Sequence, residues 1–236
     1  MTIALNVMNK PARRAGLRVA IALSVAAIAL LAACSSLPDK PTRATMYDFG
    51  PGELTQRPQN RMAPLPSLAI DDIATPGGAL DNQQLLYRLG YADGQQLKPY
   101  SQARWSMPPA QLVRQRLRQQ LGQNRAVFNA GEGVTLNRSA NVVLPLLLRL
   151  DLEEFSQVFT SPDNSVGLIK LRATLVEVTP GGEKLRGQRS VIVQRPAPTQ
   201  DAPGGVRALT AATDAAIEEI DQWLAQQPAP MPTAIR

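Results

Sequence analysis

The chain has 236 residues, of which 25 are basic and 19 acidic, so its formal net charge is +6. It contains one cysteine and no histidine, which excludes zinc sites built on cysteine and histidine, Ser-His-Asp triads and imidazole acid–base catalysis. After its N-terminal segments, the chain is long enough for one domain with one hydrophobic core.

The first segment has the layout of a secretory signal. A positively charged stretch precedes an uncharged, alanine-rich apolar run over 19–31, which ends at Ala32, Ala33 and Cys34. This run is shorter than the about 20 apolar residues that a transmembrane helix needs. The positive charges are Lys10, Arg13, Arg14 and Arg18.

Leu31-Ala32-Ala33-Cys34 resembles the lipobox of bacterial lipoproteins. The resemblance implies cleavage between Ala33 and Cys34 and acylation of Cys34, which anchors the protein because each buried CH₂ contributes about 0.8 kcal/mol. Many inner-membrane lipoproteins have aspartate at the next position, so Ser35 implies the outer membrane, with the domain in the periplasm. The alternative is an ordinary signal peptide cut after Ala33.

Removal of residues 1–33 changes the charge balance, because four basic residues and no acidic ones leave with them. The remaining chain has 21 basic and 19 acidic residues, a net charge of +2. No long run of lysine and arginine remains, so we expect no nucleic-acid partner. Acylation of Cys34 also removes the only thiol, and therefore any disulfide or cysteine nucleophile.

Residues 34–64 are predicted to be the lipidated cysteine and a flexible tether, because proline and glycine punctuate them and few large apolar side chains lie between. The exception is Met46-Tyr47-Asp48-Phe49, which we expect to dock as a short edge strand. The domain then covers 65–226, and the proline-rich residues 227–236 form a disordered tail.

The domain opens with a strand over 65–73, where apolar residues mostly alternate, followed by a turn over 75–78. Two extended segments, 84–89 and 96–100, flank Asp93-Gly94 and predict a hairpin.

A helix is predicted from Pro108 to Leu121. Ser106 is expected to cap its start, a proline fits its first turn, and Gly122 fits its end. Its apolar face comprises Leu112, Val113, Leu117 and Leu121, and its polar face comprises Arg114, Arg116, Arg118, Gln119 and Gln120.

A nearly continuous apolar run over 142–152 predicts a strand buried on both faces, with a bulge at Pro145 or pairing that starts after it. Two further strands, 166–178 and 186–194, are joined by a turn at 180–183 and predict a second hairpin.

Prolines and glycines over 196–205 predict a loop, and a closing helix follows over Val206–Gln226. Strands and two helices interleave, which predicts a single α/β domain with a mixed β-sheet flanked by helices. The residues expected to face the core from the closing helix are Leu209, Ala212, Ala216, Ile220, Trp223 and Leu224.

The order of these features resembles the ABC-type transport auxiliary lipoprotein family, over most of 46–226. After the lipobox and tether come a strand near Leu68, the motif Arg104-Trp105-Ser106-Met107-Pro108, and a core strand leading to Asp151-Leu152-Glu153-Glu154-Phe155. The motif is the most specific part, since the family commonly has Arg-Trp, a small residue and a proline. Two segments depart from the family: 75–81 carries extra glycine, and 156–165 is a polar loop to which the resemblance assigns no role.

The resemblance implies an anticodon-binding-like, three-layer fold and a non-enzymatic accessory role, without a cofactor, in phospholipid transport. It implies partners as well: an MCE-family periplasmic protein and an inner-membrane ABC transporter made of an ATPase and a permease. Homo-oligomer formation is compatible with this role. Two other functions stay open, a lipoprotein that itself carries lipid and an envelope-assembly lipoprotein unrelated to transport.

Four residues are candidates for contact with a partner or with lipid: Arg104 and Trp105 in the motif, and Arg114 and Arg118 on the first helix. A simpler role for Trp105 is to anchor the helix start in the core. A simpler role for the arginines, including Arg116, is a solvated helix face.

Three carboxylates, Asp151, Glu153 and Glu154, suggest a cation site or, more simply, a solvated strand exit. The glycine pairs at 77–78 and 181–182 read as turns, because neither has the spacing of a phosphate-binding loop followed by lysine.

Overall fold

The computed structural model describes residues 43–52, 65–130, 132, 144–179 and 181–228. The signal segment, Cys34 and most of the predicted C-terminal tail lie outside this part. The described residues from Ala44 onward form one compact unit, and the predicted single α/β domain with a mixed sheet is confirmed. The strands are β1 Thr45–Tyr47, β2 Leu68–Ile70, β3 Gln84–Leu89, β4 Gly94–Trp105, β5 Val127–Asn129, β6 Leu146–Ser161, β7 Asn164–Thr179 and β8 Gly182–Pro196. The helices are α2 Gly90–Asp93, α3 Pro109–Leu121 and α5 Ala202–Ala225.

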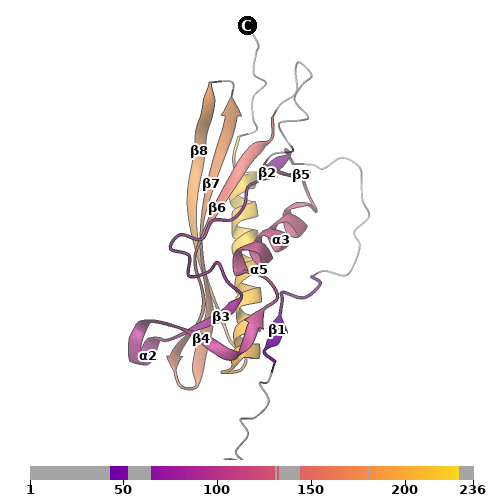
Figure 1. Ribbon diagram of the computed structural model, residues 1–236. Helices are drawn as coiled ribbons and strands as arrows, with labels where there is room; N and C mark the ends of the chain where they lie inside the picture. Colours follow the sequence, from indigo (N-terminus) through magenta and orange to yellow (C-terminus); the bar gives the residue numbers. More distant parts are fainter. Residues whose placement is uncertain (1–42, 53–64, 131, 133–143, 180, 229–236) are drawn as a thin grey trace, which may run out of the picture. The chain divides into compact units, whose positions relative to one another are not determined.

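The long strand β6 organises the sheet (Figure 1). Along one edge it pairs antiparallel with β7, which in turn pairs antiparallel with β8. Its other edge is shared: β2 pairs parallel with 146–148, and β3 pairs parallel with 157–159. Strands β4 and β1 extend the sheet from β3, while β5 extends it from β2.

The main core lies between one face of this sheet and the helices α3 and α5. Helix α5 lies along β6, β7 and β8, and α3 contacts α5 (Figure 1). The predicted apolar faces are confirmed, since the side chains expected to face the core from both helices are buried. The spacing of apolar residues at three and four positions therefore predicted correctly which face of each helix is buried.

Helix α5 begins four residues earlier than predicted, at Ala202, because Gly204 and Gly205 belong to the helix and not to the loop. A Cβ on Gly204 would overlap the carbonyl oxygen of Thr199, and one on Gly205 would overlap the buried side chain of Gln157. These glycines thus allow close packing. Asp201 caps the helix by accepting the backbone N–H of Gly204 at 2.8 Å.

Asp201 is also held as a carboxylate by its neighbours. The hydroxyl of Thr199 donates to it at 2.6 Å, and this bond, with the bond from Gly204, lowers its pKa despite partial desolvation. A negative charge at this helix end interacts favourably with the helix dipole.

Gly167 of β7 permits the closest approach of the sheet to α5. A Cβ there would lie 2.5 Å from the backbone carbon of Ala208 and 2.5 Å from the nitrogen of Leu209. Because both atoms are backbone, Gly167→Ala must push the helix off the sheet, and we expect the free energy of unfolding to fall by about 3 kcal/mol. Urea unfolding followed by circular dichroism measures this change.

The matched control is Gly181→Ala in the β7–β8 turn, where the nearest atom to a Cβ is Thr179 Oγ1 at 3.9 Å. We expect this variant to stay within about 0.5 kcal/mol of wild type. Equal losses in both variants would contradict the packing argument.

The strand predicted over 142–152 differs from β6 at both ends. Strand β6 starts at Leu146, directly after Pro145, and continues nine residues past the predicted end, to Ser161. The predicted polar loop over 156–165 is wrong: β6 and β7 are separated only by residues 162–163. The first hairpin is confirmed, with the one-turn helix α2 in place of a tight Asp-Gly turn.

The predicted solvated exit at Glu153 and Glu154 is also wrong, since both lie inside β6, at a shift in the β6–β7 register. Each carboxylate is matched by cations of neighbouring strands. Lys170 binds Glu153 at 2.7 Å and Arg172 binds it too, while Arg88 binds Glu154 at 2.9 Å. The bond from Lys170, followed by the charge of Arg172, lowers the pKa of Glu153.

Candidate functional site

The segment that follows the predicted membrane anchor packs onto the domain, and we call Thr45–Gly52 the strap. Its strand β1 pairs parallel with the end of β4, so the expected edge strand is confirmed. The backbone N–H of Ser106 donates to the carbonyl of Tyr47 at 2.7 Å. The chain leading from Cys34 is thus joined to the sheet at β1, with residues 48–67 lying between β1 and β2.

Ser106 does not cap α3, contrary to prediction. Its backbone is engaged by the strap, and the N-cap position is taken by Pro108, without a side-chain capping bond. Pro109 follows in the first turn and has no N–H, so fewer donors need a cap at this end.

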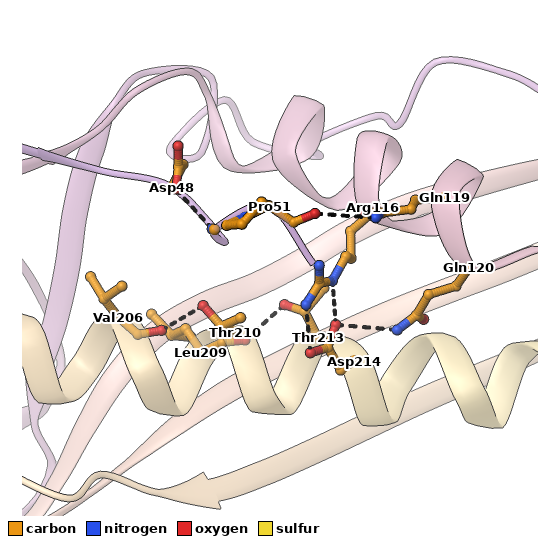
Figure 2. Close-up of polar contacts among 11 residues, drawn as sticks. Asp48, Pro51, Arg116, Gln119, Gln120, Val206, Leu209, Thr210, Thr213 and Asp214 are labelled. Atoms are coloured by element: carbon orange, nitrogen blue, oxygen red, sulfur yellow. Dashed lines mark hydrogen bonds and ion pairs between the residues drawn. The ribbon is translucent and has the colours of Figure 1, made fainter. Parts of the chain in front are cut away.

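The strap then passes over α3, as Figure 2 shows. Asp48 accepts the backbone N–H of Gly50 at 2.8 Å, and the side chain of Gln119 donates to the carbonyl of Pro51 at 3.3 Å. Gly50 and Gly52 have φ values of 68° and 72°, which favour glycine.

An aromatic cluster fastens the strap to the core. Phe49 is only 8% exposed, and its ring centroid lies 5.6 Å from that of Trp105 in an edge-to-face arrangement. Phe155 of β6 completes the cluster, 5.5 Å from Trp105 and 6.1 Å from Phe49. Since Trp105 is fully buried, its side chain packs the core, which is the simpler of the two roles considered.

Beneath the strap, Arg116 of α3 links the two long helices. Its Nε and terminal nitrogen donate to the two carboxylate oxygens of Asp214 on α5, at 2.6 and 3.0 Å (Figure 2). Gln120 donates to the same carboxylate at 3.3 Å. Because the pair is bidentate and partly buried, it fixes the position of α3 against α5.

The other two arginines of α3 are also occupied within the chain. Arg114 and Arg118 each donate to Asn129 Oδ1 at 2.9 Å, and Arg114 also lies 3.5 Å from Asp72. The polar face of α3 is therefore not a simple solvated face, because its three arginines tie the helix to β5, α5 and the loop after β2. Arg104, in contrast, is exposed on β4 and makes no side-chain hydrogen bond with another described residue.

A partly buried polar network joins β4, β6, β7 and the segment just before α5. Tyr100 donates to Gln157 Oε1 at 2.8 Å, Gln157 donates to Ser165 at 2.8 Å, and Ser165 donates to Gln200 at 2.5 Å. Burial, then the nearby Tyr87 and Asp201, raises the pKa of Tyr100 well above its ordinary value of 10.0. The neutral phenol is the form that this network needs.

This pKa shift predicts a loss of stability in alkali. Because the folded-state pKa is raised, the contribution of Tyr100 is full below about pH 10 and declines as the pH rises above that value. Tyr100→Phe should lower the free energy of unfolding by about 1–3 kcal/mol near neutral pH, since it leaves Gln157 Oε1 without this donor. At about pH 11 the difference in the free energy of unfolding between wild type and Tyr100→Phe should be smaller than near neutral pH.

Urea unfolding at the two pH values tests this expectation. The control is Tyr91→Phe at an exposed tyrosine of α2, which should leave stability unchanged at both. If the difference in unfolding free energy between wild type and Tyr100→Phe is the same at both pH values, the stability does not depend on the ionisation of Tyr100 and the prediction is wrong.

The described surface contains one groove of about 620 Å³, beside the start of α3. Its floor is partly apolar, but charged side chains of both signs line it. They are Asp72, Asp81, Arg114 and Arg118. By contrast, the cavity bounded by Leu68, Leu146, Leu175 and Leu224, between the sheet and the end of α5, measures about 40 Å³.

Among the described residues, no three or more histidine, cysteine, aspartate or glutamate side chains are grouped to hold a metal ion. Within the same part of the chain, no helix is both long enough and apolar enough to cross a membrane.

The residues that position the strap and the network were only partly accessible to sequence reasoning. Phe49 was included in an expected edge strand, yet nothing local indicated that its ring would reach Trp105 and Phe155. Gln157 fell in a predicted loop. Its place in a strand could have been predicted if Glu153 and Glu154 had been interpreted as strand residues paired with cations of neighbouring strands, because the strand pattern then continues from 146 to 161.

Comparison with known proteins gives a family and a fold. A model of the ABC-type transport auxiliary lipoprotein component matches residues 47–221. The crystal structure of protein XCC0632 from Xanthomonas campestris is similar, with 18% identity, 77% of this chain and 95% of that chain covered, and a TM-score of 0.58. A second crystal structure, of an uncharacterized protein, has 14% identity, covers 77% of this chain and 99% of that one, and gives a TM-score of 0.52. A search of curated proteins found no match.

Proposed function

Because the chain belongs to the ABC-type transport auxiliary lipoprotein family, we propose that it is a non-enzymatic accessory protein of an ABC transporter that moves phospholipid across the cell envelope. The observation that carries this proposal is the family match over 47–221, which includes most of the strap, strands β2 to β8, the whole of α3 and most of α5. As a member of a lipoprotein family, the protein is anchored to a membrane of the envelope.

The proposed mechanism is tethering. Acyl chains on Cys34 hold one end of the chain in the membrane, and the strap joins the other end of the linker to the sheet at Thr45. Even a fully extended chain from Cys34 to Ala44 spans only about 35 Å, so the domain stays near the membrane surface. Confinement raises its effective concentration toward partners in that zone.

The proposed location is the periplasmic face of the outer membrane, which rests on Ser35. The proposed partners are an MCE-family protein that reaches across the periplasm and the inner-membrane ATPase and permease. We infer that the domain acts by binding, since the chain lacks histidine and its only cysteine is the proposed lipidation residue.

The filled interior favours this role over that of a direct lipid carrier. A lipid-binding cavity needs several hundred cubic ångströms of mostly apolar space. The cavity near Leu68 and Leu224, which Arg125 and Gln227 also line, measures only about 40 Å³. The larger groove beside α3 is open and lined by four charged side chains.

Affinity purification of the tagged, lipid-anchored protein from detergent-solubilised envelopes tests the proposal, with proteins and phospholipids identified by mass spectrometry. Recovery of an MCE protein with its ATPase and permease is the expected result. Stoichiometric phospholipid without those proteins would favour the carrier. Recovery of neither would point to an envelope-assembly lipoprotein and overturn the proposal.

A further inference from the structure

Strand β8 leaves a long edge of the sheet open. It runs over fifteen residues, Gly182–Pro196, and among the described strands it pairs only with β7. In an antiparallel pair, every second residue directs its N–H and C=O away from the partner strand. The outer edge of β8 therefore presents a row of backbone donors and acceptors to any extended chain beside it.

The same strand carries the two most exposed large apolar side chains of the described chain. Leu185 is 62% exposed and Ile192 is 59% exposed. Ile192 stands opposite Lys170 of β7, while its neighbours Val191 and Val193 are buried on the other face. Strands that only need protection from association carry charges at such positions, so the exposed Leu185 and Ile192 call for another explanation.

The net positive charge of β8 indicates which kind of chain could bind at its open edge. Strand β8 contains four basic residues and one acidic residue, Glu183. Arg186 pairs with Glu177 and Arg189 pairs with Glu219, whereas Lys184 and Arg195 have no carboxylate partner among the described residues. The basic residues are Lys184, Arg186, Arg189 and Arg195.

A second copy of this chain fits the edge poorly. Pairing of β8 with another β8 would bring like charges together across the strands, which is destabilising. An acidic segment, in contrast, would neutralise Lys184 and Arg195 and cover Ile192.

We propose that β8 is the docking edge for an extended acidic segment of the periplasmic protein partner, which adds to the sheet as a further strand. The identity of that partner rests on the function proposed above, whereas the position of the edge and the acidity of its occupant rest on β8 itself. Backbone bonds would supply affinity, and Ile192 with the unpaired cations would supply specificity.

Site-specific photo-crosslinking in living cells tests this inference in the full-length, lipidated protein. A benzophenone amino acid is placed at Gln194, exposed on β8, and in a parallel strain at Gln222, exposed on α5. We expect Gln194, and not Gln222, to crosslink to a periplasmic component of the transport system. The crosslinked stretch of the partner, found by mass spectrometry, should be acidic.

Charge reversals sharpen the test. Lys184→Glu with Arg195→Glu should lower the crosslinking yield at Gln194 about tenfold, because like charges then face each other. Arg43→Glu is the control: it also reverses an exposed arginine, but outside β8, and should leave the yield unchanged. Correct folding of each variant is checked by circular dichroism.

The outcomes separate this inference from the proposed function. A transporter component that crosslinks at Gln222 but not at Gln194 overturns the docking edge and leaves the function intact. An acidic protein unrelated to transport that crosslinks at Gln194 supports the edge and overturns the function. A second copy crosslinked at Gln194, no crosslink there, or an equal loss of yield caused by Arg43→Glu overturns the inference.

Discussion

Exchange of residues 1–34 for a signal peptide that is cleaved without lipidation is expected to convert the protein from membrane-bound to soluble in the periplasm. A single acyl chain already gives a membrane partition constant of about 10⁴ M⁻¹, and several chains make the anchor effectively permanent. The shift of the protein between fractions should therefore be nearly complete. Fractionation with a high-salt wash, combined with metabolic labelling by radioactive palmitate, measures it.

Wild type should resist the wash and incorporate the label, and Cys34→Ser should lose the label. The serine variant separates lipidation from secretion, because an uncut signal segment can hold it in the inner membrane by itself. Sucrose-gradient separation of the two membranes then tests the outer-membrane location that Ser35 implies. A soluble, unlabelled wild type would mean that an ordinary signal peptide is cut after Ala33.

Truncation of Trp105 to alanine is expected to produce the largest loss of stability of any single side-chain change. The ring is fully buried and packs against Phe49 and Phe155 at centroid distances of 5.6 and 5.5 Å. Loss of such a ring typically lowers the free energy of unfolding by about 3–5 kcal/mol. Domains commonly have only about 5–15 kcal/mol in total, so the variant should unfold at far lower urea concentration.

Because Trp105 contacts Phe49, this truncation should also release the strap. Limited proteolysis should cut the variant near residues 45–52 earlier than wild type. Trp105→Phe keeps an aromatic ring in the cluster and should lose less stability. If Trp105→Ala left stability nearly unchanged but abolished partner recovery, Trp105 would be a contact residue and the packing role would be wrong.

The strap connects these two expectations. The proposed lipid anchor is joined to the domain core through β1 and then Phe49, so a force on the linker would act first on the pairing of β1 with β4 and next on the aromatic cluster. Gln119 adds a polar contact through Pro51. Release of the strap would lengthen the linker by the residues up to β2 and allow the domain to move farther from the membrane.

Several features were determined by the sequence alone, because they depend on neighbours within a few residues. Extended segments on either side of turn residues identified both hairpins, and helical spacing identified the buried faces of α3 and α5. The same local logic placed the turns at Gly77-Gly78 and Gly182, where φ values of 89°, 71° and 118° need glycine. The absence of histidine and the position of Cys34 limited the chemistry and indicated an anchor.

Tertiary structure decided the features whose partners are far apart in the chain. Arg116 and Asp214 are 98 residues apart, so no local pattern shows that this arginine joins two helices. In the sequence, Gly204 and Gly205 resemble loop residues. The structure shows that they are helical and that Thr199 and Gln157 pack too closely against them for a side chain.

In the sequence, Glu153 and Glu154 likewise resemble the end of a strand. The structure shows that they lie inside β6, where Lys170 of β7 and Arg88 of β3 pair with them. Which sheet edge stays open is also a property of strand order, and no segment of sequence contains it. Hydrophobic periodicity reports which side of an element is buried, because burial is repeated at every turn or every second residue. It cannot report what covers the polar side, because that depends on long-range pairing.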